Sequence, residues 1–318
     1  MDKNVFSEPR FHDEEAARAW FEGARWPGGP ICPHCKSDKH YATKKLGRYR
    51  CASKTCRKDF TVQTGTVMER SHAKLTEWAA AFHLAASSKK GFSAHQLHRS
   101  LHCQYNTAWF MFHRVREAMR RGSLDLPPMG GEGGIVEADE TYYGPVEKPR
   151  PRAAWRSPVT KKGNHGPANK RPIVALVERG GRVRTFHVPV ATKAEINKIV
   201  SENIARESRL HTDESRLYND ALDHVAAHKS VRHSGGQYVR YEDGEAIHTN
   251  SAEGYFSIFK RGMRGVYQHC AEKHLHRYLA EFDFRYNHRT ALGYTDEERA
   301  VLAVQGAEGK RLTYHQPD

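Results

Sequence analysis

The sequence predicts a multidomain protein that joins a small cysteine-rich β module, a helical segment and a larger α/β domain. Four of the six cysteines crowd into residues 32–56, among short β-type runs. Residues 67–122 carry helical patterns of apolar residues, and a Gly/Pro-rich stretch follows them. Beyond it, β-branched runs alternate with helical ones, which is an α/β pattern.

These changes in composition and hydrophobic pattern set the expected domain boundaries. Asp13 is placed to cap a first helix, which the Pro27-Gly-Gly-Pro30 run ends. The expected segments are a helical lead-in (1–28), the cysteine module (29–66), the helical segment (67–122), a linker (123–134), the α/β domain (135–300) and a C-terminal tail (301–318).

The charge balance indicates a polyanionic partner. Lys and Arg number 51 against 37 Asp and Glu, a formal net charge of +14. Such an excess favours nucleic acid over a generally basic, soluble surface. There is no signal-like start and no apolar run near the ~20 residues that span a bilayer, so we expect a cytoplasmic protein without a membrane partner.

The clustered cysteines predict a structural zinc site. Zn²⁺ takes four ligands in a tetrahedron, and two cysteine pairs on two β-knuckles supply them, as in a zinc ribbon. The first pair is a C-x-x-C knuckle, whereas the second is C-x-x-x-x-C, two residues longer than usual. The expected ligands of this one zinc ion are Cys32, Cys35, Cys51 and Cys56.

Two alternatives stay open at this site. His34 or His40 could replace a cysteine that faces away, whereas Cys103 and Cys270 are read as ordinary small residues. The module is also basic, with Arg48 among its cations, so it either reads DNA or merely holds a mini-domain together. The expected DNA contacts here are Arg48 and Arg50.

Residues 93–119 have the pattern of a helix-turn-helix. Ser93 can cap a first helix with an apolar stripe, and a second helix opens near Asn106. A simple helical bundle explains the pattern equally well. In the DNA-binding reading, basic side chains of the second helix meet phosphates: Arg114, Arg116, Arg120 and Arg121.

Two aspartates at strand ends suggest an oxygen-rich cation site. In residues 135–144, alternation places Glu137 and Asp139 on one face of an apolar strand, where a carboxylate is costly unless exposed, paired or metal-bound. Asp213 ends a second short strand. A hard cation takes such ligands, although strand-end Asp is also a common cap.

A helix over residues 248–262 carries the third group of candidates. Asn250, Glu253, Ser257 and Lys260 recur at one helical face, while aromatic residues lie mostly off it and can pack. The stripe is either a solvated face or part of a site. Residues 144–171, rich in Pro, Gly and basic residues, are expected to form a flexible excursion, either a solvated loop or a DNA-backbone contact.

These stretches resemble one known family. The matching motifs are RWPGGPICPHC, YRC, DFTVQTGTVME, SSKKGFSAHQL, TAWFMFHRVREAM, VEADETYYG, HTDES, HTNSAEGYFSIFKRG and HLHRYLAEFDFRYNHR. The chain resembles the insertion-sequence transposases of the IS1595 group, prokaryotic relatives of the Merlin elements, from about residue 15 to about residue 295.

The resemblance implies an N-terminal zinc ribbon, a helical DNA-binding part and an RNase H-like catalytic domain. It implies a carboxylate triad followed by a lysine, with Asp139 first, Asp213 second and Lys260 as the trailing base. The third ligand is Glu253 or Asn250. Glu253 is favoured because a carboxylate is the better Mg²⁺ ligand, with Asn250 as rival or helper.

The implied function is DNA transposition: binding of transposon ends, cleavage, and joining of 3′ ends to target DNA with two Mg²⁺ or Mn²⁺ ions. The partners would be terminal inverted repeats and target DNA, with at least a homodimer bound. Arg261 and Arg264 would extend the phosphate track. The alternatives are a zinc-ribbon regulator or domesticated, non-cleaving transposase, and a structure-selective nuclease.

Overall fold

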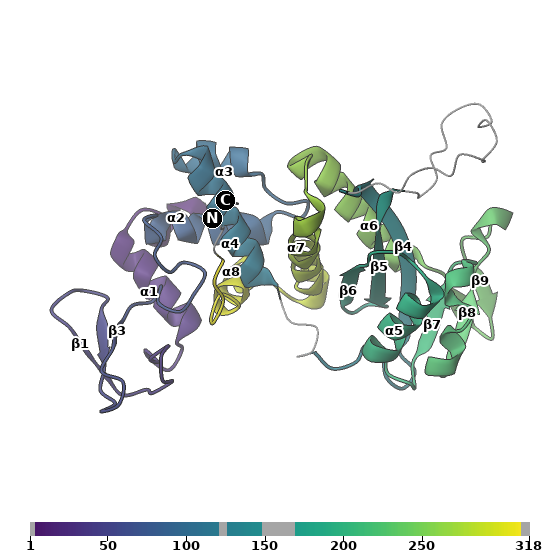
Figure 1. The fold of residues 1–318 in the computed structure, drawn as a ribbon, viewed down its shortest axis with the longest axis horizontal. Helices are drawn as coiled ribbons and strands as arrows, with labels where there is room; N and C mark the ends of the chain where they lie inside the picture. The colour runs from purple at the N-terminus through teal and green to yellow at the C-terminus, as the bar shows by residue number, and fades with distance from the viewer. Residues whose placement is uncertain (1–3, 121–125, 148–168, 313–318) are drawn as a thin grey trace. The chain divides into compact units, whose positions relative to one another are not determined.

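The computed structural model describes residues 4–120, 126–147 and 169–312. The chain divides into two compact units, which are described one at a time (Figure 1). The first unit comprises Met1–Arg121 and His288–Asp318, and the second comprises Gly122–Asn287. Most of the predicted excursion at 144–171, and Arg121 with it, lies outside the described residues.

The first unit contains a small antiparallel sheet of three short strands in the order β1-β2-β3. β1 spans His40–Ala42, β2 spans Tyr49–Cys51 and β3 spans Asp59–Phe60. Trp26 lies against the rings of Tyr49 and Phe60, which gives the sheet an aromatic core. The predicted cysteine-rich β module is therefore present.

In the described part of the first unit, five α-helices accompany this sheet. Asp13 caps the first of them by accepting a hydrogen bond from the Ala16 N–H, as predicted. The helix from Leu75 buries Trp78 and Phe82 along with most of its alanines, so its apolar surface is wider than a single stripe. The helices are α1 (Glu14–Arg25), α2 (Leu75–Ser87), α3 (Ala94–Leu101), α4 (Tyr105–Met119) and α8 (Asp296–Gln305).

The predicted pair of helices at residues 93–119 forms with a short turn between its members. Ser93 accepts from the Gln96 N–H while the Gln96 side chain accepts from the Ser93 N–H, a reciprocal capping box at the start of α3. His102 ends α3 in the left-handed conformation, which turns the chain into α4. Leu97 and Phe112 are buried, so both helices pack through their predicted apolar faces.

The second unit is built on a five-stranded sheet in the order β6-β5-β4-β7-β8. β4, β5 and β6 form an antiparallel meander, and β7 and β8 run parallel to β4. This mixed order is that of the RNase H-like fold that the resemblance implied. The strands are β4 (Ile135–Pro145), β5 (Lys170–Glu178), β6 (Val183–His187), β7 (Arg209–Thr212) and β8 (Ala227–Ser230).

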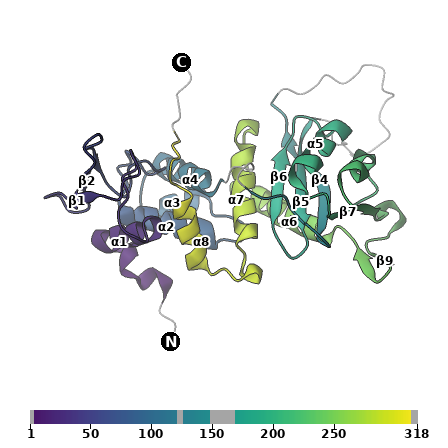
Figure 2. The ribbon, with the colours of Figure 1, turned by 90° about the horizontal axis from the view of Figure 1, so that it is seen from below.

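Helices cover both faces of this sheet (Figures 1 and 2). α5 (Lys193–Asn203) packs on one face in a core that includes Val136 and Leu176. α6 (Asn250–Gly262) and α7 (Leu275–Asn287) pack on the other face, against Ile173, Ala175 and Val177 of β5. Because side chains alternate along a strand, each buried strand contributes to both cores.

Smaller elements complete the two units. β9 (Arg240–Glu242) and β10 (Glu245–Ile247) form a separate hairpin between β8 and α6. Neither β8 nor this hairpin was among the predicted strands. The short helical turns are Val5–Ser7, Pro9–Phe11, Arg216–Tyr218, Ala221–His224, His233–Gly235, Met263–Tyr267, Glu272–His274 and Thr290–Leu292.

The end of the chain differs from the predicted boundaries. The sequence reading continues the α/β domain to residue 300 and makes 301–318 a tail, whereas His288 onward belongs to the first unit. α8 packs on α1, α2 and α4 and buries Ala300, Ala303 and Val304. The apolar face of α8 packs against helices that are distant in sequence. Local sequence patterns cannot reveal such a long-range contact.

Because the end of α8 packs closely against α4, we expect an added side chain at Gly306 to lower the stability of the first unit. A Cβ added at Gly306 would lie 2.4 Å from the Ala118 carbonyl oxygen, so α4 or α8 would have to shift. We expect Gly306→Ala to destabilise the first unit by about 1–3 kcal/mol, the usual effect of overpacking. Urea unfolding followed by tryptophan fluorescence measures this, since four of the five tryptophans lie in the first unit.

Gly23→Ala is the matched control for that substitution. Gly23 lies inside α1 with nothing within 4 Å of an added Cβ, so alanine should raise stability by up to about 1 kcal/mol. Wild-type stability of the Gly306→Ala variant would contradict the packing described here.

Candidate functional site

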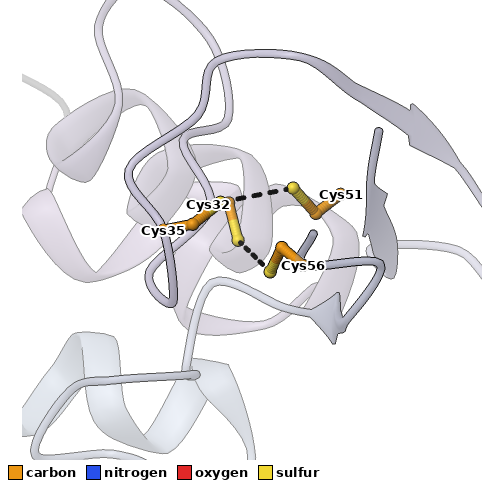
Figure 3. Close-up of side chains that lie close together, drawn as sticks. All are labelled: Cys32, Cys35, Cys51 and Cys56. Carbon is orange, nitrogen blue, oxygen red and sulfur yellow. Dashed lines mark hydrogen bonds between the residues drawn. The ribbon is translucent and has the colours of Figure 1, made fainter. Parts of the chain in front are cut away.

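The four predicted cysteine ligands come together in the first unit (Figure 3). Their sulfur atoms all lie within 4.8 Å of one another, with 3.8 Å between Cys32 and Cys56 and 3.5 Å between Cys35 and Cys51. A tetrahedron with Zn–S bonds of 2.3 Å has sulfur–sulfur edges of about 3.8 Å. The spacing therefore fits one tetrahedral ion of zinc size.

The two turns that carry the cysteine pairs share one backbone conformation. The residue after the second cysteine of each pair, Lys36 or Arg57, adopts a positive φ of 62° or 51°. This left-handed residue closes each turn, so the longer second knuckle still presents its sulfurs inward. His40 instead lies near the Asp38 carbonyl at 2.9 Å, and neither His40 nor His34 is needed to complete the sulfur set.

Two predicted DNA contacts lie on the cysteine ribbon beside one carboxylate. Arg50 donates to Asp59 at 2.5 Å, and Arg48 lies 3.5 Å from the same carboxylate. The hydrogen bond from Arg50 lowers the pKa of Asp59. Both arginine side chains stay nearly half exposed, so this surface keeps a net positive charge that can meet phosphate.

The predicted phosphate contact at Arg114 is not supported, and the prediction needs correction. The Arg114 side chain is buried, with its guanidinium over the Phe110 ring and a hydrogen bond to the Glu69 carbonyl. Arg116 is buried too, over Phe112. Sequence spacing placed these cations on an outer face, but their long apolar stems pack into the bundle.

In the second unit, strand pairing brings the two predicted aspartates side by side. β4 pairs in parallel with β7, with Ile135 opposite Arg209 and Glu137 opposite His211. Asp139 lies two residues beyond Glu137 on β4, and Asp213 lies two residues beyond His211, just past the end of β7, so both lie toward the same end of this strand pair. Two residues that are 74 positions apart (213 − 139) therefore meet at one edge of the site.

The charges at this edge perturb one another. Burial, followed by the negative charges of Glu140 and Asp213, raises the pKa of Asp139 to about 7. Glu253 adds to this rise, so its carboxylate is within electrostatic reach of Asp139. Burial lowers the pKa of the Lys260 ammonium, and the charge of Asp139 opposes that effect. Asp139, Asp213, Glu253 and Lys260 thus share one electrostatic environment.

α6 supplies the last two of these groups from one face, as the sequence predicted. The helix begins at Asn250, which is exposed, and Glu253 lies in its first turn. The Glu253 carboxylate accepts from the Thr249 hydroxyl at 3.3 Å and lies 3.5 Å from His233. Among the described residues, only the four cysteines have ligand atoms close enough together to bind one metal ion without movement. The carboxylates of the second unit are neighbours, but their oxygen atoms are not gathered around a single point.

Glu140 is a fourth carboxylate that the sequence reading did not single out. It follows Asp139 directly, on the other face of β4, and accepts from the Tyr218 hydroxyl at 2.9 Å and the Ser215 hydroxyl at 3.2 Å. Burial and the charge of Asp213 raise its pKa. The run Glu137-Ala-Asp-Glu140 carries three acids on a largely buried strand, and that density was the available signal.

Two further predicted DNA contacts follow Lys260 along the chain. Arg261 is exposed at the end of α6, where it donates to the Ser257 hydroxyl at 2.6 Å. Arg264 is exposed one turn later. Both cations are therefore exposed on the surface, where they can approach a phosphate backbone.

Comparison with known proteins gives matches in both units. A family model described as an ISXO2-like transposase domain matches residues 132–287, and one described as a transposase zinc-ribbon domain matches residues 12–59. An uncharacterized protein in transposable element ISH50 of Halobacterium salinarum is 29% identical over 287 residues, which cover 86% of this chain and 91% of that protein.

The crystal structure of a pre-cleavage Mos1 transpososome also matches, at 8% identity and a TM-score of 0.25, over 71% of this chain and 74% of that one. A similarity this low carries no weight here. The two family matches cover the cysteine ribbon and the mixed sheet, and the chain belongs to the ISXO2-like, or IS1595, family of transposases. Within the described residues, no helix is long and apolar enough to cross a membrane.

Proposed function

We propose that this transposase binds the ends of its element, cleaves DNA there and joins the freed 3′ ends to target DNA by metal-dependent phosphoryl transfer. One observation carries the proposal. The charges of Asp213 and Glu253 act on Asp139, and the charge of Asp139 acts on Lys260, so groups from β4, from the end of β7 and from α6 support a shared site.

The donor set fits hard divalent cations such as Mg²⁺ or Mn²⁺. Carboxylate oxygens are their preferred ligands, and Asp139, Asp213 and Glu253 would hold two ions. Burial first, and then the neighbouring negative charges, raise the pKa of Asp139, and a bound cation would neutralise those charges. Two such ions, when bound, stabilise the charge that develops on the attacking and leaving oxygens.

Glu253 is the better candidate than Asn250 for the third ligand. Its charge contributes to the raised pKa of Asp139, which requires proximity, whereas Asn250 is exposed at the start of α6. A carboxylate also binds Mg²⁺ more strongly than an amide does. Asn250 would then act as a helper that contacts DNA or a bound water.

Lys260 would orient the scissile phosphate. It lies two turns beyond Glu253 on the same helix face, half-buried and attracted to Asp139. A cation in this place can neutralise a non-bridging phosphate oxygen as the reaction proceeds. Arg261 and Arg264 would hold the neighbouring phosphates, and the basic ribbon, through Arg48 and Arg50, would bind DNA outside the catalytic unit. Joining two transposon ends calls for at least a homodimer on DNA.

We further propose that the cysteine ribbon holds one structural zinc ion. Four sulfur ligands leave no open position for a substrate, so the metal would stabilise the fold rather than act in cleavage. Cys51 ends β2 and is buried, which couples the metal to the small sheet.

Removing one ligand should release the zinc. In Cys51→Ser, we expect the purified protein to fall from about one zinc per chain to near none, with a clear loss of thermal stability, since a three-ligand site loses most of its affinity. Elemental analysis and thermal unfolding measure the two effects. Cys103→Ser is the control and should keep its zinc, and a full equivalent of zinc in Cys51→Ser would refute the assignment.

Replacing each aspartate by asparagine tests its proposed role as a metal ligand. Asp139→Asn or Asp213→Asn should lower Mg²⁺-dependent cleavage of a plasmid carrying the element's inverted repeats by about a thousandfold or more, because ligand loss removes several kcal/mol of transition-state stabilisation. Binding of the ends, measured by gel shift, should persist. Asp220→Asn, at an exposed ion pair with Lys193, serves as the control.

Two outcomes would count against this proposal. Full cleavage by either variant would show that the aspartate replaced in it is not a catalytic metal ligand. Absence of Mg²⁺- or Mn²⁺-dependent cleavage and joining by the wild-type protein, with end binding intact, would indicate a regulator or a domesticated, non-cleaving transposase instead.

The third ligand is identified by comparing two alanine variants. We expect Glu253→Ala to reduce the cleavage rate far more than Asn250→Ala, since only the former removes a charge that reaches Asp139. Single-turnover cleavage at saturating DNA measures both rates. A larger loss in Asn250→Ala would assign the role to the amide.

A further inference from the structure

A buried carboxylate joins the central strand to the helix that carries Glu253. The Glu137 side chain is fully buried on β4. Its Oε2 atom accepts hydrogen bonds from the backbone N–H groups of Ser251 at 2.7 Å and Ala252 at 3.2 Å, and its Oε1 atom accepts from the Ser251 hydroxyl at 3.0 Å. It thus satisfies the free N–H groups in the first turn of α6, where a negative charge is also favoured by the helix dipole.

Arg179 holds the same carboxylate from the turn between β5 and β6. Its Nε atom donates to Glu137 Oε1 at 3.0 Å, so the buried charge is paired. The guanidinium also donates to the Ala246 carbonyl at 2.8 Å and lies 3.3 Å from the His248 carbonyl. Arg179 therefore fixes both the carboxylate and the chain that leads into α6.

Two histidines extend this network to β7. Arg179 Nη2 lies 3.2 Å from His211 Nδ1, and His248 Nδ1 lies 3.2 Å from Glu137 Oε1. On its far side, His211 Nε2 lies 3.1 Å from Glu245 of the β9–β10 hairpin. The network consequently contacts β4, β7, the hairpin and the start of α6.

The spacing of the network relative to the candidate ligands is regular. Glu137 precedes Asp139 by two residues, His211 precedes Asp213 by two, and Ser251 precedes Glu253 by two. On a strand, two residues return to the same face, so Glu137 lies directly beneath Asp139. Glu137, His211 and Ser251 are therefore each close along the chain to a candidate ligand.

We infer that Glu137 is a positioning residue, which sets the distance between the carboxylates of β4 and Glu253 of α6 by bonding the first turn of that helix. The inference rests on the proposed function, because it concerns the same three ligands. Glu137 itself contacts neither metal nor DNA. It acts through the place of α6, in the way that outer hydrogen bonds orient the ligands of metal sites.

The test uses Glu137→Gln in the full-length, zinc-loaded protein. Glutamine keeps the size of the side chain but removes its charge and leaves a single acceptor oxygen, which can accept either from the backbone N–H groups of Ser251 and Ala252 or from Arg179, and not from both sides. With Mn²⁺ alone as the probe, electron paramagnetic resonance should show affinity at the carboxylate site reduced by about 10- to 100-fold. Hydrogen exchange at residues 250–253 should become faster, and cleavage should fall in parallel.

Asp283→Asn is the matched control for loss of a buried carboxylate. Asp283 on α7 accepts from the Thr185 hydroxyl at 2.8 Å and from the Tyr255 hydroxyl at 2.6 Å, within the same unit but away from the first turn of α6. Burial raises the pKa of Asp283 to about 7, so a neutral amide is a mild replacement. Its Mn²⁺ affinity should stay within about twofold of wild type, well short of the outer-ligand effect.

The possible outcomes distinguish a failure of the positioning role of Glu137 from a failure of the proposed function. A folded Glu137→Gln variant with wild-type Mn²⁺ affinity and exchange, beside an inactive Asp139→Asn, would overturn the positioning role and leave the proposed function intact. An active Asp139→Asn would overturn the proposed function itself. If Glu137→Gln does not fold, Ser251→Ala removes only the hydroxyl bond: a several-fold loss of Mn²⁺ affinity supports the inference, and an unchanged affinity refutes it.

Discussion

The parallel pairing of β4 with β7 is the constraint on which the second unit depends. It brings Asp139 of β4 and Asp213, which follows β7, toward the same end of the two strands. Burial, followed by the charges of Glu140 and Asp213, raises the pKa of Asp139 to about 7. Such an arrangement lowers stability unless something compensates it. Lys260 offsets part of the charge, and the bound cations that we propose would offset the rest. The buried Glu137–Arg179 pair anchors the helix that completes the site.

Much of this architecture could be predicted from the sequence because it depends on local patterns. The cysteine spacing predicted the ribbon, the alternation around Asp139 predicted a strand, and the period from Asn250 to Lys260 predicted a helix with one polar face. The mixed sheet followed from the family resemblance rather than from periodicity. Both aspartates were expected at strand ends, but only Asp213 follows the end of its strand, whereas Asp139 lies in the middle of β4, which extends to Pro145. Neither residue alone indicates a site, and the pairing of β4 with β7 brings their two segments together.

The features that escaped prediction depend on contacts between distant segments. Arg114 was expected to meet phosphate, but it lies buried over Phe110 because its apolar stem packs in the bundle. The chain returns to the first unit at His288, where α8 covers an apolar surface formed by helices near the other end of the chain. The partners of Glu137 are likewise far away in sequence, so the alternation that placed it beside Asp139 could not reveal its contact with α6.

The most direct measurement of the central claim is anomalous diffraction from crystals of the full chain soaked in Mn²⁺. The account predicts anomalous peaks between the carboxylates of Asp139 and Asp213 and beside Glu253, distinct from the zinc peak at the four cysteines. The account would be contradicted if Mn²⁺ bound elsewhere on the chain and left these three carboxylates free of metal, even in crystals that also contain bound DNA.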